Sequence, residues 1–119
     1  MNLLDIANRA ERAEDPDREM FIAAWVDCFA PGGSMVIRDW PGGLCAKWIK
    51  FMRLVDEEGW VNAAMMFVPD EFHDDWSLYP APQVGRRWEG CVGDFATNAL
   101  DPALALFAAA LRKRAEMAS

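Results

Sequence analysis

The chain has few of the side chains that enzymes use for catalysis. Its 119 residues include one histidine, one tyrosine, one threonine and three serines. His73 has no serine or cysteine beside it in the sequence, so the fold would have to bring a nucleophile and a general base together. This composition favours a protein that acts by binding, and we expect neither an enzyme nor catalytic residues.

The sequence also lacks the patterns of membrane-spanning segments and of nucleotide-binding loops. No apolar run approaches the roughly 20 residues that cross a bilayer, and no basic segment precedes an apolar one at the N-terminus. Gly32-Gly33 and Gly42-Gly43 match neither dinucleotide-binding nor phosphate-binding loops, so we interpret both pairs as turns. We expect a soluble, cytoplasmic protein that makes no membrane contact.

The three cysteines indicate neither a disulfide framework nor a metal site. Cys28, Cys45 and Cys91 are odd in number, far apart and without C-x-x-C spacing. We expect structural thiols and no cofactor or metal.

Apolar residues, by contrast, are plentiful. They make up 53% of the chain, and six tryptophans and seven phenylalanines supply large surfaces to bury. At this length the chain is expected to form a single domain over residues 1–119.

The first half of the chain is predicted to be helical over 2–57. Asn2 can cap a first helix, and Asp15-Pro16 is expected to start a second helix that ends near Phe29. Apolar residues at helical spacing predict an amphipathic helix over 42–57. Between the last two helices, "SMVIRDW" at 34–40 is expected to be a short strand.

The second half is predicted to be a β-meander over 60–95 followed by a helix over 102–116. The expected strands are 60–68, 76–79 and 87–95, with Gly90 and Gly93 marking a bulge or a close approach. Asp101-Pro102 begins the last helix, in which Leu104, Phe107, Ala108 and Leu111 form an apolar stripe and Arg112, Lys113 and Arg114 complement the helix dipole. The predicted fold is therefore α+β, with a small antiparallel sheet of about three strands packed by helices.

Three segments resemble a group of small phage and prophage proteins. They are "LLDIANRAERAEDPDRE" near the start, "EEGW" at 57–60, and "NALDPALALFAAALRKRAE" near the end. Those proteins are similar to the phage α-β-α sandwich domain, so the resemblance implies that fold and a phage setting. It brings no catalytic residues.

The charge is concentrated in residues 54–85, the acidic window. It contains no lysine or arginine, and because the rest of the chain has twelve charges of each sign, it accounts for the whole net charge of −7. Its seven carboxylates are Asp56, Glu57, Glu58, Asp70, Glu71, Asp74 and Asp75.

Such a block is often only solvated surface, but here a partner-binding face is also indicated. The carboxylates of Asp56, Glu57 and Glu58 lie at the end of a predicted helix, where they oppose the helix dipole. A meander is expected to bring them and the carboxylates of residues 70–75 to one edge of the sheet. Phe72, Trp76 and Tyr79 would then provide apolar anchors between the charges.

The resulting hypothesis is a phage-encoded, non-enzymatic inhibitor of the anti-CRISPR or anti-restriction type. Its acidic face would compete for the basic nucleic-acid-binding surface of a host defence nucleoprotein complex, inside the cytoplasm of the infected host, without binding nucleic acid itself.

Other interpretations stay open. The chain can be a phage accessory protein without catalytic activity that self-associates, for example as a homodimer, or that binds a small ligand or nucleotide in a pocket under the sheet through Arg86, Arg87 and Trp88. Carboxylates and His73 in "DEFHDD" at 70–75 offer metal-ligand types, although their spacing fits no known metal site.

Overall fold

The computed structural model describes residues 2–33, 35, 38, 40–81, 85 and 87–118. These residues form five α-helices and a three-stranded antiparallel sheet, which confirms the α+β class in one domain. The elements in chain order are α1 (Leu3–Arg12), α2 (Arg18–Phe29), η1 (Pro31–Gly33), α3 (Leu44–Asp56), α4 (Trp60–Met65), η3 (Asp70–Phe72), β1 (Trp76–Pro80), β2 (Trp88–Val92), β3 (Phe95–Ala99) and α5 (Pro102–Met117).

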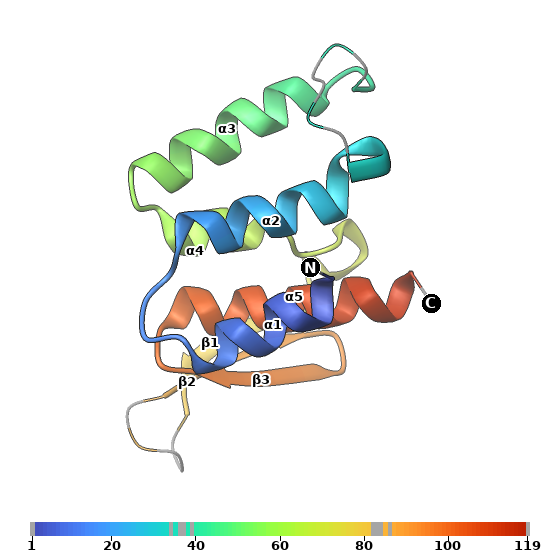
Figure 1. Cartoon of the computed structure of the whole chain (residues 1–119). Helices are drawn as coiled ribbons and strands as arrows, with labels where there is room; N and C mark the ends of the chain where they lie inside the picture. Colours follow the sequence, from blue (N-terminus) through green and yellow to red (C-terminus); the bar gives the residue numbers. More distant parts are fainter. Residues whose placement is uncertain are drawn as a thin grey trace.

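The helix α5 is the central element (Figure 1). Asp101 caps it, because Oδ1 accepts from the N–H of Ala103 at 2.8 Å, and Pro102 occupies the first helical position, where no N–H is needed. Every side chain from Ala103 to Leu111 is buried, since α1, α4 and all three strands surround the helix. The apolar stripe expected from the sequence is thus only part of a surface buried all round.

The sheet crosses α5 at Gly90. A Cβ at this position would lie 2.5 Å from the carbonyl oxygen of Ala105 and 2.6 Å from the nitrogen of Leu106. On the next strand, the hydroxyl of Thr97 donates to the same Ala105 carbonyl at 2.7 Å. Of the two roles expected for Gly90, the structure shows the close approach.

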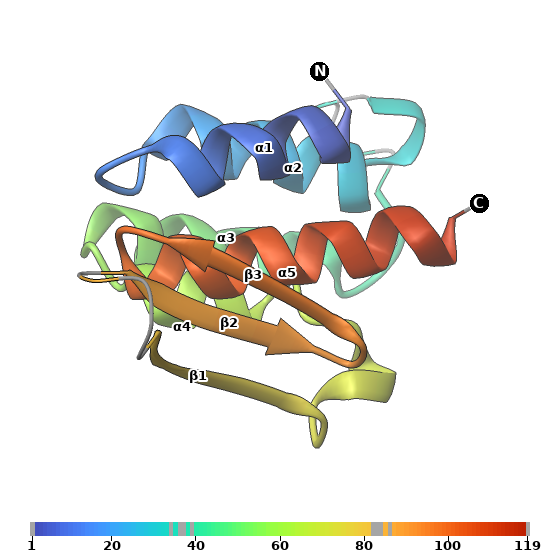
Figure 2. The same ribbon diagram turned by 90° about the horizontal axis from the view of Figure 1, so that it is seen from below.

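Helices cover only one face of the sheet. The strand order is β1-β2-β3, and Leu78, Gly90 and Thr97 lie in register on the face toward α5. Figure 2 shows the other face, with no helix in front of it. The sheet of the described chain is therefore not enclosed between helical layers as the phage resemblance implied, because α1 to α4 all pack on the α5 side.

Aromatic rings join the helices. Phe107 of α5 stacks on Phe21 of α2 with centroids 4.1 Å apart, and Phe67 packs edge-on against both rings. Trp25 of α2 stacks on Phe51 of α3 at 4.8 Å. All five side chains are fully buried, so α3 joins the core through α2.

Residues 60–68 are not the expected strand. Trp60–Met65 form α4, and the chain then turns, with Phe67 and Val68 buried. Periodicity cannot distinguish a short helix from a strand when both faces are apolar. Here the segment lies between α3 and α5, and the small side chains of Ala63 and Ala64 allow it to pack there as a helix.

Residues 87–95 hold parts of two strands rather than one. β2 ends at Val92 and β3 begins at Phe95, with Gly93-Asp94 as the turn between them. Gly93 has a φ of 60°, which suits glycine in a two-residue hairpin turn. The meander therefore spans 76–99 instead of 60–95.

The start of the second helix also differs from the expectation. Asp17, not Asp15, caps α2, because its Oδ1 accepts from the N–H groups of Glu19 and Met20 at 2.8 and 3.4 Å. Pro16 belongs to the link that carries the chain from α1 to α2. The Asn2 cap of α1 and the helix expected over 42–57 are confirmed, the latter as Leu44–Asp56.

The strand expected over 34–40 falls largely outside the described residues, which omit Ser34, Val36, Ile37 and Asp39. Within the described part of the chain, no helix has both the length and the apolar character required to cross a bilayer.

Candidate protein-binding surface

The carboxylates of the acidic window do not meet at one edge. Glu58 borders a surface recess with Asp101 at the start of α5, whereas Asp70 borders one with Arg114 near its end. About 20 Å of helix separates these two positions along α5, at roughly 1.5 Å per residue. The expectation of a single cluster was wrong because the whole connection over residues 59–69 runs from the start of α5 to near its end.

Asp56, Glu57 and Glu58 complete the end of α3. Asp56 forms an ion pair with Arg18 of α2, and this cation offsets its unfavourable position at the negative end of the helix. The backbone of Glu58 is in the left-handed conformation, with a φ of 58°. The N–H groups of Glu58 and Gly59 donate to carbonyls in the last turn of the helix, at 3.2 and 2.7 Å. This group therefore has a local role in ending the helix.

The second group, which we call the acidic segment, consists of Asp70, Glu71, Asp74 and Asp75. All four residues are exposed, on η3 and the turn that leads into β1. Among the described residues, none of the four forms an ion pair with a lysine or arginine. The one ion contact joins Asp70 to His73, with 3.7 Å between Oδ1 and Nε2. Asp70 and Glu71 lie within electrostatic reach of Arg114, so the acidic segment presents exposed anions that no direct ion pair with a lysine or arginine of the described chain neutralises.

A buried lysine holds the acidic segment in place. The ammonium of Lys113 lies 4.7 Å from the ring centre of Phe72 and bonds to Asp94 at 2.9 Å and to Glu116 at 3.0 Å. The hydrogen bond from Lys113 lowers the pKa of the Asp94 carboxyl, and the same bond raises the pKa of Lys113. Phe72, expected as an anchor for a partner, is half-buried and also packs over Gly93.

β1 has an open edge beside the acidic segment. Asp75 lies just before the strand and Ala81 just after it. The carbonyl of Asp75 and the N–H of Ala81 each form a backbone hydrogen bond of 2.9 Å on the β2 side of the strand. Because such bonds fall on every second residue of an antiparallel strand, the backbone N–H and C=O groups of Trp76 and Leu78 point away from β2. No strand of the described chain pairs with this edge (Figure 2).

Two of the expected anchors lie on this strand. Trp76 and Tyr79 are 38% and 39% exposed and project from opposite faces of the sheet. The hydroxyl of Tyr79 donates to Glu89 on β2, which orients the ring. Pro80 ends the strand and has no N–H to offer, so the open edge is limited to a few residues. The open edge, the acidic segment, Trp76 and Tyr79 together form what we call the β1 surface.

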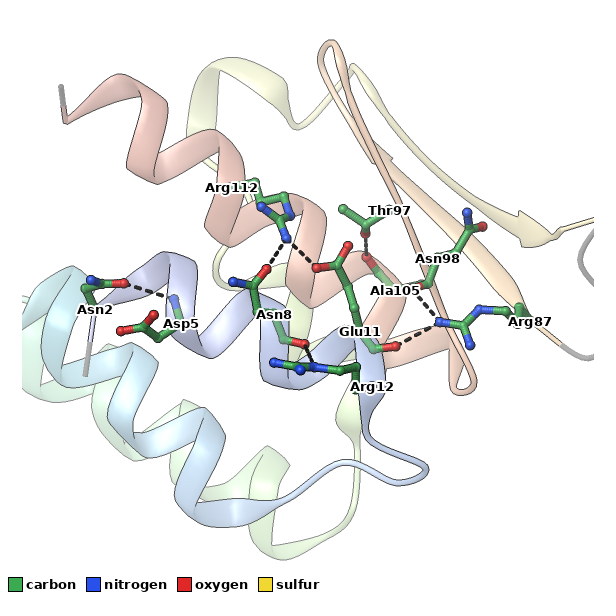
Figure 3. Close-up of polar contacts among 10 residues, drawn as sticks. All are labelled: Asn2, Asp5, Asn8, Glu11, Arg12, Arg87, Thr97, Asn98, Ala105 and Arg112. Atoms are coloured by element: carbon green, nitrogen blue, oxygen red, sulfur yellow. Dashed lines mark hydrogen bonds and ion pairs between the residues drawn. The ribbon is translucent and has the colours of Figure 1, made fainter.

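The opposite edge of the sheet is occupied. The guanidinium of Arg87 donates to the carbonyl of Glu11 on α1 at 2.8 Å and to that of Asn98 on β3 at 3.2 Å (Figure 3). Arg112 of α5 bonds to Asn8 and Glu11 of the same helix α1. Arg87 thus joins α1 to β3 and Arg112 joins α1 to α5, which holds α1 on the β3 side of the sheet and leaves the β1 side open.

The residues considered for a nucleotide site have other contacts. Arg87 is held by the two carbonyls, and Trp88 is half-buried against the core. Arg86 lies outside the described residues. The three basic residues near the end of α5 likewise have specific contacts, with Arg112 on α1, Lys113 on Asp94 and Arg114 on the carbonyl of Phe67.

The side chains best suited to catalysis or metal binding are hydrogen-bonded or buried. The Nε2–H of His73 donates to the carbonyl of Val68 at 3.0 Å. Burial raises the pKa of the Cys28 thiol to about 12, which keeps it protonated and unreactive near neutral pH. Within the described part of the chain, no three histidine, cysteine or acidic side chains are grouped as metal ligands require.

Comparison with known proteins yields no relative: no protein-family model, no curated protein and no solved structure matches this chain. The resemblance to small phage proteins remains a hypothesis based on the three segments that suggested it.

The acidic segment is visible in the sequence, whereas the open edge of β1 was not predicted from it. With a strand expected over 60–68, the segment 76–79 would have been the middle strand, paired on both sides. The available signal was Pro80, because proline in a sheet is confined to edges, strand ends and bulges.

Proposed function

We propose that this protein is a non-enzymatic inhibitor whose β1 surface occupies a basic nucleic-acid-binding surface of another protein. The observation that carries the proposal is the placement of four exposed carboxylates, none in an ion pair with a lysine or arginine of the described chain, directly before an open strand edge. Following the phage resemblance, the proposed partner class is a host defence nucleoprotein complex.

The two parts of the β1 surface supply different contributions to binding. Exposed carboxylates attract lysine and arginine side chains that otherwise hold phosphates, which favours rapid association. The free N–H and C=O groups of Trp76 and Leu78 can pair with an extended segment of the partner, adding a strand to the sheet. The exposed rings of Trp76 and Tyr79 provide apolar contact beside these bonds.

The engaged histidine and the protonated Cys28 support an action by binding rather than by catalysis. Competition then needs no chemistry. Nucleic acid and the β1 surface would exclude each other from the same cationic groups of the partner.

The test is affinity capture from a bacterial lysate followed by competition. The captured protein must bind nucleic acid, and duplex DNA or RNA must displace it from the chain. The acidic-segment variant carries four neutral replacements: Asp70→Asn, Glu71→Gln, Asp74→Asn and Asp75→Asn. The control variant carries the same loss of charge elsewhere: Glu14→Gln, Asp15→Asn, Glu57→Gln and Glu58→Gln.

We expect the acidic-segment variant to lose capture and the control variant to keep it. Equal capture by both variants would show that total charge, not the β1 surface, determines binding. Capture that nucleic acid fails to reverse would contradict the proposed competition.

A second pair of variants tests the open edge. Leu78→Pro removes one outward N–H without removing a bond to β2, while Leu78→Ala shortens the side chain and keeps that N–H. We expect the alanine variant to bind the partner and the proline variant to fail. If gel filtration shows a dimer that Leu78→Pro abolishes, the edge serves self-association instead.

A further inference from the structure

A cavity of about 390 Å³ lies between α2, α3 and the end of α5, on the side of η3. Its walls are partly apolar, with contributions from Trp25, Phe29, Met66 and Val68, and partly charged. This volume falls in the range of sites for small organic molecules, which typically combine apolar walls with a few polar groups. The cavity is distinct from the β1 surface, although Asp70 and Glu71 border both.

Three cations border this cavity in an otherwise acidic protein. Lys47 and Lys50 lie one turn apart on α3, so they project from the same side of the helix. In the described part of the chain, neither ammonium group has an ion-pair partner. Their positions provide two free positive charges beside an apolar cavity.

The third cation, Arg114, is partly withdrawn from water. Burial lowers the pKa of its guanidinium, which lies 4.7 Å from the ring centre of Phe29, and its Nε donates to the carbonyl of Phe67. Among the described residues, no hydrogen bond or ion pair involves its two terminal nitrogens. A guanidinium whose two terminal nitrogens have no hydrogen bond is well suited to bind a carboxylate or phosphate.

We propose that this cavity binds a small organic anion with an apolar body. Lys47, Lys50 and Arg114 hold its carboxylate or phosphate, and its apolar part packs on Phe29 and Met66. Asp70 and Glu71 on the rim disfavour ligands with several negative charges. This inference does not depend on the proposed inhibitor function.

The test uses four naphthalene compounds and isothermal titration calorimetry. Naphthoate and naphthyl phosphate carry the expected anion, naphthol is uncharged and naphthylmethylamine is a cation. We expect one or both anions to bind, the neutral compound to bind at least roughly tenfold more weakly, and the cation not to bind. The stronger of the two anions identifies the head group. Failure of both anions, or tighter binding of the cation, would overturn the proposal.

Matched variants then locate the site. Lys50→Gln removes a charge at the cavity, and Arg53→Gln removes the same charge one turn further along α3, outside the cavity. We expect the first to weaken anion binding severalfold, the double variant with Lys47→Gln to weaken it further, and the Arg53→Gln variant to bind like the unmodified chain. Equal effects at positions 50 and 53 would indicate only general attraction.

A variant without a charge change tests the interior. Met66→Trp fills the cavity. We expect this variant to bind no anion, with circular dichroism confirming that it folds. Full affinity in a folded Met66→Trp variant would place the anion elsewhere.

Discussion

At the residue scale, Gly90 sets the distance between the sheet and the central helix. Gly90→Ala would place a methyl group 2.5 Å from the backbone of Ala105, so β2 or α5 must shift. We expect the free energy of unfolding to fall by at least about 2 kcal/mol, measured by urea denaturation. Gly42→Ala is the control, since a Cβ there meets nothing within 4 Å, and a similar loss at both positions would argue against the close approach.

Glu58 shows a second constraint on a single residue. Its φ of 58° is unfavourable for any residue with a Cβ, so Glu58→Gly should raise the free energy of unfolding by about 1 kcal/mol. Glu57→Gly should lower it, because Glu57 has a φ of −89° and gains nothing from glycine. Urea unfolding of the two variants measures both signs, and destabilisation by both would refute the left-handed closure of α3.

At the scale of elements, the start of α2 depends on one aspartate. Asp17→Ala removes the oxygen that accepts the N–H groups of Glu19 and Met20. We expect a loss of about 1 kcal/mol of unfolding free energy from this variant and almost none from Asp15→Ala. If thermal or urea unfolding shows a larger loss of stability for Asp15→Ala than for Asp17→Ala, Asp15 is the cap instead.

The bond between Lys113 and Asp94 joins α5 to the turn between β2 and β3. Because this bond lowers the pKa of Asp94 below its ordinary value of 3.8, its stabilisation is present above that value and is lost as the pH falls through the lower folded pKa. At pH 7 we expect Asp94→Asn to unfold at lower urea than the unmodified chain, with the difference shrinking as the pH falls below 3.8.

Asp74→Asn provides the control for this pH dependence, since Asp74 is exposed and lies in the same region. It should follow the unmodified chain at every pH. A constant difference between the Asp94→Asn variant and the unmodified chain from neutral to acid pH would mean that the Lys113 bond does not respond to the Asp94 charge.

At the scale of the whole molecule, the uneven distribution of charge predicts how the protein associates. Screening shortens the reach of exposed charges from roughly 30 Å at 0.01 M salt to about 8 Å at physiological ionic strength. Association through the acidic segment should therefore slow by at least about tenfold over this range, while dissociation changes less. Surface plasmon resonance with the captured partner measures both rates.

The acidic-segment variant is the natural comparison in this experiment, and its association rate should depend much less on salt. If the unmodified chain associates at the same rate at all salt concentrations, its carboxylates do not guide binding. The partner would then be recognised through Trp76 and Tyr79 in an apolar contact.

Much of the local structure follows from the sequence by itself. The helix α5 was predicted because Asp101-Pro102 is a strong start signal and apolar residues follow at helical spacing, and both act within one turn of chain. The same local rules predicted the Asn2 cap of α1 and the length of α3. Composition and the positions of charged residues can be read from the sequence without knowing the fold, so the acidic segment could be recognised directly.

Tertiary structure decided what depends on neighbours distant in the chain. Residues 60–68 are apolar on both faces, and Trp60–Met65 became a helix because they lie between α3 and α5. That outcome made β1 an edge strand. The cavity bordered by Trp25, Lys50 and Arg114 also draws on three different helices. Neither the open edge nor the cavity has a pattern in the sequence, because both arise where segments far apart along the chain meet.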